Sequence, residues 1–399
     1  MKTKTENRTL TIFLEGRIDT NNAGEVEREI SEAVGNRDDS VEHVVMDAGT
    51  LEYISSAGLR VLMKLRKELK EPLRISEVSR DVYEIFETTG FTELFDIRKA
   101  LREISVEGCE VLGAGAFGTV YRMDSETIAK IYAPNIPLEF VDKERANSKE
   151  AFLFGVPTAI AFDTVKCGDS YGVVYELVEA KMLADFIDRD PSCIPEMVGQ
   201  AVSVLKEIHA IEVPEETNFT DRKAYFKKWF SQNFTGLLEQ EEISKVMEML
   251  DVIPDRRTFL HGDYNAKNIM TQNGELILID IGEGAYGHPV FDIAMLMLAY
   301  IYLPKNPHLD EQTKRQFLGF DPALSGQVWG VMCGEYFGIS DPQEIGKITQ
   351  MLLPLMNLYV VYQGLATGRA PKEIMVEMMR GLVLPSLEQG FVFDESLFE

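Results

Sequence analysis

Three oxygen-bearing side chains have a spacing that could place them around one metal ion. They are Asp263, Asn268, which follows five positions later, and Asp280, a further twelve positions on. A carboxylate can orient or deprotonate an acceptor hydroxyl, while an amide oxygen and a second carboxylate can hold Mg²⁺ on the phosphates of ATP. We therefore expect Asp263 to be a base and Asn268 and Asp280 to be metal ligands, with ATP and Mg²⁺ as cofactors.

The residues between Asn268 and Asp280 predict how these side chains are brought together. Two apolar runs, Ile269-Met270 and Leu276 to Ile279, are separated by the turn signal Asn273-Gly274. This pattern favours two short strands joined by a tight hairpin. Such a hairpin would return Asp280 beside Asn268, so that both could reach one metal. The alternative is a polar loop whose aspartate only caps a helix.

A glycine-rich segment upstream contains Gly113, Gly115 and Gly118 in the pattern GxGxxG, which several kinds of nucleotide-binding loop share. In dinucleotide-binding folds the third glycine opens a helix, whereas here Thr119-Val120-Tyr121 continues as a β-branched strand. A β-hairpin over phosphates is the kinase arrangement, in which Lys130 would contact the α and β phosphates. The alternative is a hairpin without a ligand and an exposed strand lysine.

Lys130 would need an anionic partner to fix its position on the phosphates. Residues 138–154 predict a helix, and Glu144 in this helix is the best placed carboxylate. Glu150, six positions further along the same helix, is the second choice. We expect an ion pair between Lys130 and one of these two side chains.

A second hairpin is predicted by the apolar runs over residues 158–166 and 171–178. Its last residues lead through Glu176 and Val178 to a helix that begins near Leu183. In a kinase this connector is the hinge whose backbone groups pair with adenine. Glu176 and Val178 are therefore expected to bind the nucleotide.

The first hundred residues predict a separate α/β domain, because strand and helix patterns alternate along them. Strands are predicted over residues 10–14, 41–47 and 73–75. Helices are predicted after the Gly16 to Asp19 turn, with Asp19 or Thr20 as N-cap, after Ser55-Ser56, and over residues 80–88 and 92–103.

Within these residues, Tyr53 to Arg60 is the most specific stretch. Through it, residues 8–104 resemble the STAS domain, also called the anti-sigma factor antagonist family. In that family a serine at a helix N-terminus is phosphorylated during partner switching. Alignment on Gly58-Leu59 implies that Ser56 is the phosphoacceptor, and the resemblance allows a protein partner at the STAS surface.

The chain departs from the STAS pattern at two positions. Ser55 stands where the family has an aspartate, and Ala57 where a second hydroxyl often stands. The alternative role for Ser55 or Ser56 is only to cap the helix, which also needs a hydroxyl, so both roles stay open. A phosphate there would gain from the helix dipole but would add nearly two negative charges to the docking face.

Four motifs follow in the second half of the chain: His261-Gly262-Asp263, Asn268, Asp280-Ile281-Gly282 and Phe291-Asp292-Ile293-Ala294. Through them, residues 109–300 resemble the aminoglycoside and choline phosphotransferase branch of the protein-kinase-like superfamily. The resemblance implies Asp263 as base, Asn268 and Asp280 as Mg²⁺ ligands, and His261 and Asp292 as structural supports of the catalytic loop. A protein kinase would have a longer activation loop, closed by Ala-Pro-Glu.

Two departures from that branch leave the acceptor open. The glycine-rich loop is closer to that of protein kinases than the branch usually shows. Lys267 also sits where some kinases carry a basic residue near the γ-phosphate, so we place it with Asp263 among the expected catalytic residues.

The helical pattern over residues 194–210 ends with His209, which is expected to pack or to cap. An aromatic cluster follows, from Tyr225 to Phe234. Packing between helices is its plainest role. The alternative is the lining of an acceptor pocket, because aromatic rings bind cations well.

The formal net charge of −25 argues against nonspecific binding to nucleic acid or to an anionic membrane. A solvated acidic surface explains this charge, which would also suit a cationic acceptor. The four cysteines lack metal-binding spacing, and no apolar run approaches the length of a membrane span, about 18 residues. We expect a cytoplasmic protein without a zinc site, a secretion signal or a membrane anchor.

Together these patterns predict an α/β STAS domain over residues 1–105 and a bilobal protein-kinase-like α+β domain. Its N-lobe would cover residues 106–180 and its mainly helical C-lobe residues 181–399. The leading hypothesis is an ATP- and Mg²⁺-dependent phosphotransferase that acts on a small-molecule hydroxyl acceptor and is coupled to a regulatory or docking STAS module. One rival is a serine protein kinase that phosphorylates Ser56 in the same chain or in a second copy. Another is a nucleotide-gated scaffold without catalysis.

Overall fold

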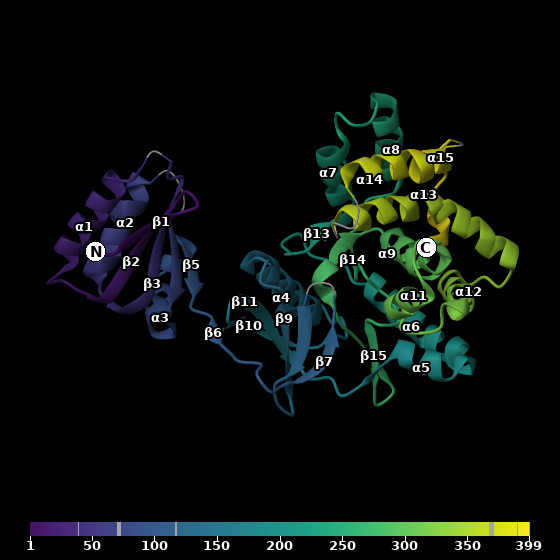
Figure 1. Cartoon of the computed structure of the whole chain (residues 1–399), viewed down its shortest axis with the longest axis horizontal. Helices are drawn as coiled ribbons and strands as arrows, with labels where there is room; N and C mark the ends of the chain where they lie inside the picture. Colours follow the sequence, from purple (N-terminus) through teal and green to yellow (C-terminus); the bar gives the residue numbers. More distant parts are fainter. Residues whose placement is uncertain (39, 70–72, 116–117, 367–370, 389, 399) are drawn as a thin grey trace. The chain divides into compact units, whose positions relative to one another are not determined.

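The computed structural model of the chain describes residues 1–38, 40–69, 73–115, 118–366, 371–388 and 390–398. The chain divides into two compact units, Met1–Ile104 and Ser105–Glu399, and each has its own apolar core. Figure 1 shows the elements of both units. None of the helices in the described part combines the length and the apolar composition that crossing a lipid bilayer requires.

In the first unit strands and helices alternate along the chain. The elements are β1 (Thr3–Glu6), β2 (Thr9–Ile18), α1 (Ala23–Gly35), β3 (His43–Ile54), α2 (Ser56–Glu68), β4 (Arg74–Val78), α3 (Arg80–Thr88), the short turn η1 (Phe91–Glu93), β5 (Asp96–Lys99) and β6 (Arg102–Glu103). The sheet has the order β1-β2-β3-β4-β5, antiparallel between β1 and β2 and parallel elsewhere. Leu10, Ile12 and Leu14 alternate into its core along β2, as a half-buried strand requires.

The predicted helix over residues 92–103 is wrong. The chain makes only the turn η1 and then adds β5 to the sheet, with Asp96 opposite Arg74 and Ile97 opposite Ile75. Arg74 Nε also donates to Asp96 Oδ2 at 2.7 Å. Pairing with β5 satisfies the backbone groups along the outer side of β4, and this gain outweighs a weak local helical preference.

The expected N-cap of the first helix, Asp19 or Thr20, is also wrong. The strand β2 continues through a bulge at Gly16, where φ is +62°, and α1 begins only at Ala23. Asn22 holds the connecting turn, because its Oδ1 accepts a hydrogen bond from Asp19 N at 2.8 Å. The turn predicted over Gly16 to Asp19 therefore also begins too early, because β2 continues to Ile18 and the connection to α1 follows it.

The second unit opens with a sheet of order β10-β11-β9-β8-β7 and one long helix. The elements are β7 (Glu110–Ala114), β8 (Gly118–Arg122), β9 (Thr127–Tyr132), α4 (Leu138–Leu153), β10 (Ala161–Cys167) and β11 (Ser170–Glu176). The helix predicted over 138–154 and the hairpin predicted over 158–178 are both confirmed. In the glycine-rich segment, Ala116 and Phe117 lie outside the described residues.

The rest of the second unit is mainly helical, with two small sheets of order β12-β15-β16 and β13-β17-β14. The strands are β12 (Lys181–Met182), β13 (Thr220–Asp221), β14 (Thr258–Leu260), β15 (Ile269–Gln272), β16 (Glu275–Leu278) and β17 (Ala285–Gly287). The longer helices are α5 (Leu183–Arg189), α6 (Ile194–His209), α7 (Arg222–Phe234), α8 (Gln240–Val252), α9 (Val290–Met297), α11 (Glu311–Leu318), α12 (Ser325–Phe337), α13 (Pro342–Ala366) and α14 (Lys372–Met378). Short helical segments are η2 (Pro191–Cys193), η3 (Ile281–Glu283), η4 (Leu298–Tyr302), α10 (Leu303–Lys305), η5 (Pro322–Leu324), η6 (Met379–Val383), α15 (Leu384–Ser386) and η7 (Glu395–Phe398).

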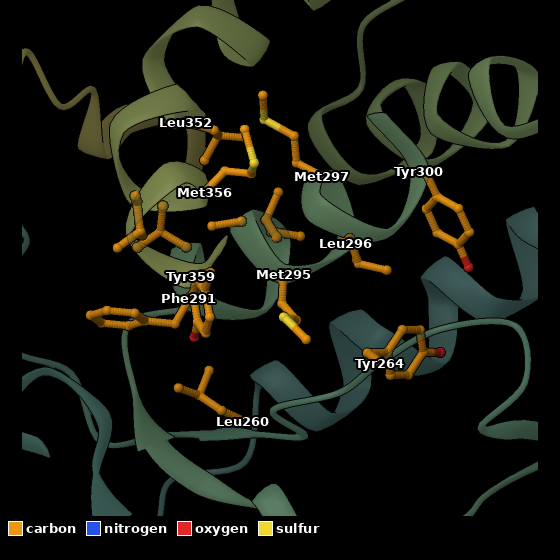
Figure 2. Packing of buried hydrophobic residues seen from close by; sticks show 14 of the residues in the cluster. Leu260, Tyr264, Phe291, Met295, Leu296, Met297, Tyr300, Leu352, Met356 and Tyr359 are labelled. Atoms are coloured by element: carbon orange, nitrogen blue, oxygen red, sulfur yellow. The ribbon is translucent and has the colours of Figure 1, made fainter. Parts of the chain in front are cut away.

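The core of this helical part is centred on α9, whose residues are all buried. Figure 2 shows α9 contributing Phe291 and Met295 to a core that Leu352, Met356 and Tyr359 of α13 complete. A helix that is apolar on every side must be surrounded by other elements. The helix α9, which follows Asp280 in the chain, is therefore packed firmly into the core of the second unit.

The aromatic cluster of α7 is part of the same core. Phe226, Phe230 and Phe234 are fully buried, and the Phe226 ring stacks on Phe291 with 6.0 Å between ring centroids. Tyr225 is the most exposed member, at 36%. The packing role predicted for the cluster is confirmed.

Candidate active site

The hairpin between Asn268 and Asp280 forms as predicted. β15 and β16 are antiparallel, and the turn residues Asn273 and Gly274 have φ values of +55° and +87°. Two positive φ values in a two-residue turn match the right-handed twist of the strands, which explains the Asn-Gly sequence. Ile279 N donates to Asn268 O at 2.9 Å, so the hairpin returns Asp280 directly beside Asn268.

Asp263 is held by two amides from its own loop. Asn268 Nδ2 donates to Asp263 Oδ2 at 2.9 Å, and Asn265 Nδ2 donates to Asp263 Oδ1 at 3.0 Å. Burial and the neighbouring Asp280 charge raise the pKa of Asp263 to about 7, although the two amides act in the opposite direction. This carboxyl is therefore balanced between its charged and neutral forms near neutral pH, as an efficient general base requires.

Lys130 joins the two lobes of the second unit at the site. Its Nζ donates to Glu144 Oε1 at 2.7 Å and to Asp280 Oδ1 at 2.8 Å, whereas Glu150 accepts a hydrogen bond from Asn218 N. Burial alone would lower the pKa of Lys130, but the Asp280 and Glu144 carboxylates raise it above its ordinary value. Burial would likewise raise the pKa of Asp280, but Lys130 holds it below the usual range. Both groups stay charged at neutral pH.

Helix α4 is fixed to the loop that follows Asp280. Glu144 is 5% exposed, and Tyr175 donates to its Oε1 at 3.2 Å. One turn along the helix, Asn147 Nδ2 donates to Gly282 O at 3.2 Å. Asn147 was missed from the sequence, although its spacing of three from Glu144 places both on one helix face.

A buried aspartate supports the loop that carries Asp263. Asp292 accepts hydrogen bonds from His261 N at 2.9 Å and from Gly262 N at 2.8 Å, and His209 Nε2 lies 3.1 Å from its Oδ2. Burial would raise the pKa of Asp292, but these partners keep it below its ordinary value. His209 also lies 2.7 Å from the Tyr336 hydroxyl through Nδ1, so it does more than pack.

His261 orders the start of the loop from a fully buried position. Its Nδ1 accepts a hydrogen bond from Asp263 N at 3.3 Å, and its ring is fully buried. Burial lowers the pKa of His261, which keeps the imidazole neutral. The loop is further attached where Ala266 N donates to the Tyr300 hydroxyl at 2.9 Å and Tyr264 donates to Ala201 O at 2.6 Å.

Lys267 is not brought together with Asp263. Its Nζ donates to Gln316 O at 2.8 Å, at the end of α11, and its stem packs on Gly319. The proposed role of Lys267 near a γ-phosphate stays a prediction.

The predicted nucleotide-binding glycines lie on β7 and β8. Gly115 N donates to Gly118 O at 2.8 Å, which links the ends of β7 and β8. A Cβ on Gly118 would lie 2.3 Å from Ile131 O, so the close approach of β8 to β9 requires glycine there. Gly113 has no atom within 4 Å of its Cβ position, so packing places no such demand on it.

The predicted hinge connects the two lobes. Glu176 ends β11 and accepts a hydrogen bond from Ile160 N at 3.4 Å, and Val178 O accepts one from Ala180 N at 3.0 Å. The segment then forms β12, where Lys181 pairs with Thr271 of the β15 strand. The hinge therefore lies beside the hairpin that carries Asp280.

In the first unit the two serines have different environments. Ser55 is the N-cap of α2, and its hydroxyl accepts a hydrogen bond from Ala57 N at 3.2 Å. Ser56 is the first residue of the helix and is exposed. The capping role therefore falls on Ser55, and it leaves the Ser56 hydroxyl accessible.

The donor set of the site fits Mg²⁺. In the described residues, no group of three or more His, Cys, Asp and Glu side chains could form a protein-only metal cage. Mg²⁺ is usually held by one or two protein oxygens together with phosphates and water, and the amide oxygen of Asn268 and the carboxylate of Asp280 supply that minimum. These residues would hold the ion on a bound nucleotide.

Comparison with known proteins gives a match for each unit. The profile of the phosphotransferase enzyme family matches residues 108–326, and that of the STAS domain matches residues 1–104. BtrV of Bordetella bronchiseptica, assigned by name as an anti-sigma factor antagonist, is 38% identical over 87 residues, covering 21% of this chain and 72% of that protein. YbdM of Bacillus subtilis, assigned by name as a serine/threonine-protein kinase, is 31% identical over 98 residues, covering 21% of this chain but only 38% of that protein.

Solved structures similar to the chain are of phosphotransferases. Aminoglycoside phosphotransferase APH(4)-Ia with ADP and hygromycin B is 11% identical, with a TM-score of 0.45, and the match covers 76% of this chain and 97% of that one. A choline/ethanolamine kinase family protein from Mesorhizobium loti is 16% identical, with a TM-score of 0.41, over 70% of this chain and 88% of that one. Both similarities are distant.

Proposed function

The chain belongs to the phosphotransferase enzyme family and carries an N-terminal STAS domain, and from this membership we propose that it transfers the γ-phosphate of ATP to a hydroxyl acceptor in a Mg²⁺-dependent reaction. The observation that carries the proposal is the convergence of three separate segments: the loop with Asp263 and Asn268, the segment with Asp280, and β9 with Lys130. Phosphoryl transfer needs little covalent chemistry from the protein, so positioning these groups is the main requirement.

In the proposed reaction Asp263 orients the acceptor hydroxyl and takes its proton. The acceptor oxygen forms a bond to the γ-phosphorus, the bond from that phosphorus to the β–γ bridging oxygen breaks, and ADP leaves. The pKa of Asp263, about 7, is suited to accepting this proton at neutral pH. Mg²⁺, bound by Asn268 and Asp280, would neutralise charge on the phosphates.

Lys130 would hold the α and β phosphates under the glycine-rich turn of Gly113, Gly115 and Gly118. Glu144 already fixes the ammonium group at 2.7 Å, so its position does not depend on the nucleotide. Lys130 also contacts Asp280, which it would share with Mg²⁺. The backbone of the hinge from Glu176 to Val178 would pair with adenine.

The acceptor is proposed to be a small hydroxyl compound, and the net charge of −25 favours a cationic one. The described cysteines are free thiols, which agrees with a reaction in the reducing cytoplasm. An acceptor screen with Mg²⁺ and ATP, on the full chain and on residues 106–399, tests the proposal. Transfer should fall by roughly 100- to 10,000-fold in Asp263→Asn, while nucleotide binding persists. Full transfer by that variant would refute the assignment of the base.

A second candidate function is supported by the exposed Ser56. Because Ser55 caps the helix, Ser56 is free to be a substrate, and the similarity to YbdM agrees with a serine kinase. Mass spectrometry after incubation with ATP and Mg²⁺ would show a phosphate on Ser56 and none in Ser56→Ala. No label on Ser56 under conditions that phosphorylate a small acceptor would exclude this candidate.

A further inference from the structure

Arg222 is a buried cation that no motif in the sequence marks. It is the first residue of α7 and is 5% exposed. The preceding Asp221 caps this helix by accepting a hydrogen bond from Ala224 N at 2.9 Å. Asp221 also ends β13, which pairs in parallel with β17, and there Asp221 lies opposite Tyr286. The start of α7 therefore lies directly beside the segment that follows Asp280.

The guanidinium group of Arg222 lies between the loops that carry Asp263 and Asp280. Its Nη2 donates to the carbonyl oxygen of Glu283, and its Nη1 is 3.7 Å from Glu283 Oε2. Gly262 adjoins the same guanidinium, because a Cβ there would lie 2.8 Å from Arg222 Nη2 and 2.2 Å from Glu283 O. Gly262 also has φ +82°, which favours glycine. The two loops thus meet at this one side chain.

A role in packing alone does not account for a charged group at this position. Burying a cation costs much more free energy than burying an apolar side chain of similar volume. Burial would lower the pKa of Arg222, but Tyr359 and Glu283 raise it above its ordinary value, so the charge is retained. Arg222 Nε has no hydrogen-bond partner among the described residues, which leaves Glu283 as its main polar contact.

We propose that Arg222 is a positioning residue that sets the distance between the base Asp263 and the metal ligand Asp280. The inference rests on the proposed phosphotransferase function. Arg222 holds Glu283, three residues after Asp280, and adjoins Gly262, the residue before Asp263. It acts through these two loops and touches no reacting atom. A displacement of about 1 Å at a catalytic group can cost on the order of 100-fold in rate, so the effect belongs in kcat.

The test compares Arg222→Lys with Arg256→Lys in the full-length chain. Arg256 likewise donates to a backbone carbonyl group, that of Phe398, and to a carboxylate, that of Glu395, and these two partners lie outside both loops. Lysine keeps the charge and loses the planar donor pair. We expect kcat to fall about 100-fold in Arg222→Lys with KM for MgATP within about threefold, and kcat in Arg256→Lys to stay within about threefold. Equal kcat values for the two variants would overturn the inference.

Amide hydrogen exchange separates failure of this inference from failure of the proposed function. If the wild type transfers no phosphate to any acceptor, the function fails, but exchange still reports on the loops. We expect the segments 260–264 and 281–286 to exchange at least about tenfold faster in Arg222→Lys, while α6 is unchanged. Unchanged exchange in these two segments, or faster exchange across the whole second unit, would refute a specific positioning role for Arg222.

A second variant covers the case in which Arg222→Lys does not fold. Glu283 has a half-exposed side chain, so Glu283→Gln removes the neighbouring charge without exposing the core. It should change the same two loops in the same direction, with a loss of kcat of about tenfold or less. Wild-type kcat together with wild-type loop exchange in Glu283→Gln would then overturn the inference.

Discussion

At the scale of single residues, the ionisation of Asp263 is set by its surroundings. Burial and Asp280 raise its pKa to about 7, and the carboxylate form is the one that can accept a proton. Activity should therefore rise as the pH increases through about 7. The measurement is the pH dependence of kcat/KM for MgATP.

Asn265→Ala provides the matched variant for this pH profile. The hydrogen bond from Asn265 favours the charged form of the Asp263 carboxylate. Because the variant removes this bond, the pKa of Asp263 should rise and the acid limb should move to higher pH. An acid limb near pH 4 in the wild type, or no shift in the variant, would contradict this account of the base.

The same raised pKa predicts that Asp263 weakens the fold at neutral pH. The folded state binds the proton of the Asp263 carboxyl group more tightly than the unfolded chain does. The contribution of this group to the free energy of unfolding is therefore fully present below about pH 4 and is lost as the pH rises through about 7. Asp263→Asn should therefore be more stable than the wild type at pH 8, by up to about 4 kcal/mol, and similar at pH 4. Denaturant unfolding of the second unit measures this difference, with the exposed turn variant Asp169→Asn as the control.

Residue types and spacing were enough to select the central groups of the site. Asp263, Asn268 and Asp280 converge as their spacing suggested, and Lys130 pairs with Glu144, the first choice over Glu150. The contacts that give Arg222, His209 and Asn147 their roles could not be derived in this way, because the partners are distant in sequence. The direction of Lys267 toward Gln316 depends on α11 for the same reason.

At the scale of elements, the β15–β16 hairpin depends on the backbone of its turn. Gly274 has φ +87° and open space at its Cβ position, so an alanine would meet backbone strain and no steric clash. Gly274→Ala should destabilise the second unit by about 1 kcal/mol.

Gly346 of α13 provides a control of opposite sign. It also has open space but lies in a helix, so Gly346→Ala should stabilise the second unit by roughly 0.5–1 kcal/mol. Denaturant unfolding of both variants is the measurement. The same sign of change in the two variants would contradict this reading of the turn.

The elements that the sequence predicted well are those with strong local signals. The Asn273-Gly274 turn fixes a hairpin by itself, and the apolar periodicity of α6 is long enough to identify a helix. Residues 92–103 lack such a signal, and part of them forms β5 because it can pair with the edge of β4. Local patterns cannot reveal an unpaired strand that lies elsewhere in the chain.

At the scale of the whole molecule, the two units have separate apolar cores. Phe86 is fully buried in α3 of the first unit, so Phe86→Ala should cost that unit roughly 3–5 kcal/mol. Calorimetry should show the transition of the first unit at a lower temperature, with the transition of the second unit unchanged. The exposed variant Glu87→Ala should leave both transitions in place. One merged transition that moves as a whole would contradict independent cores.

The separate tasks of Ser55 and Ser56 also have a consequence for signalling. Ser55 keeps the first turn of α2 closed whatever happens to its neighbour, because its hydroxyl is already engaged with Ala57 N. Phosphorylation of Ser56 would therefore add nearly two negative charges beside a helix start whose backbone is already capped. Such a phosphate can be added and removed without waiting for α2 to unfold and refold.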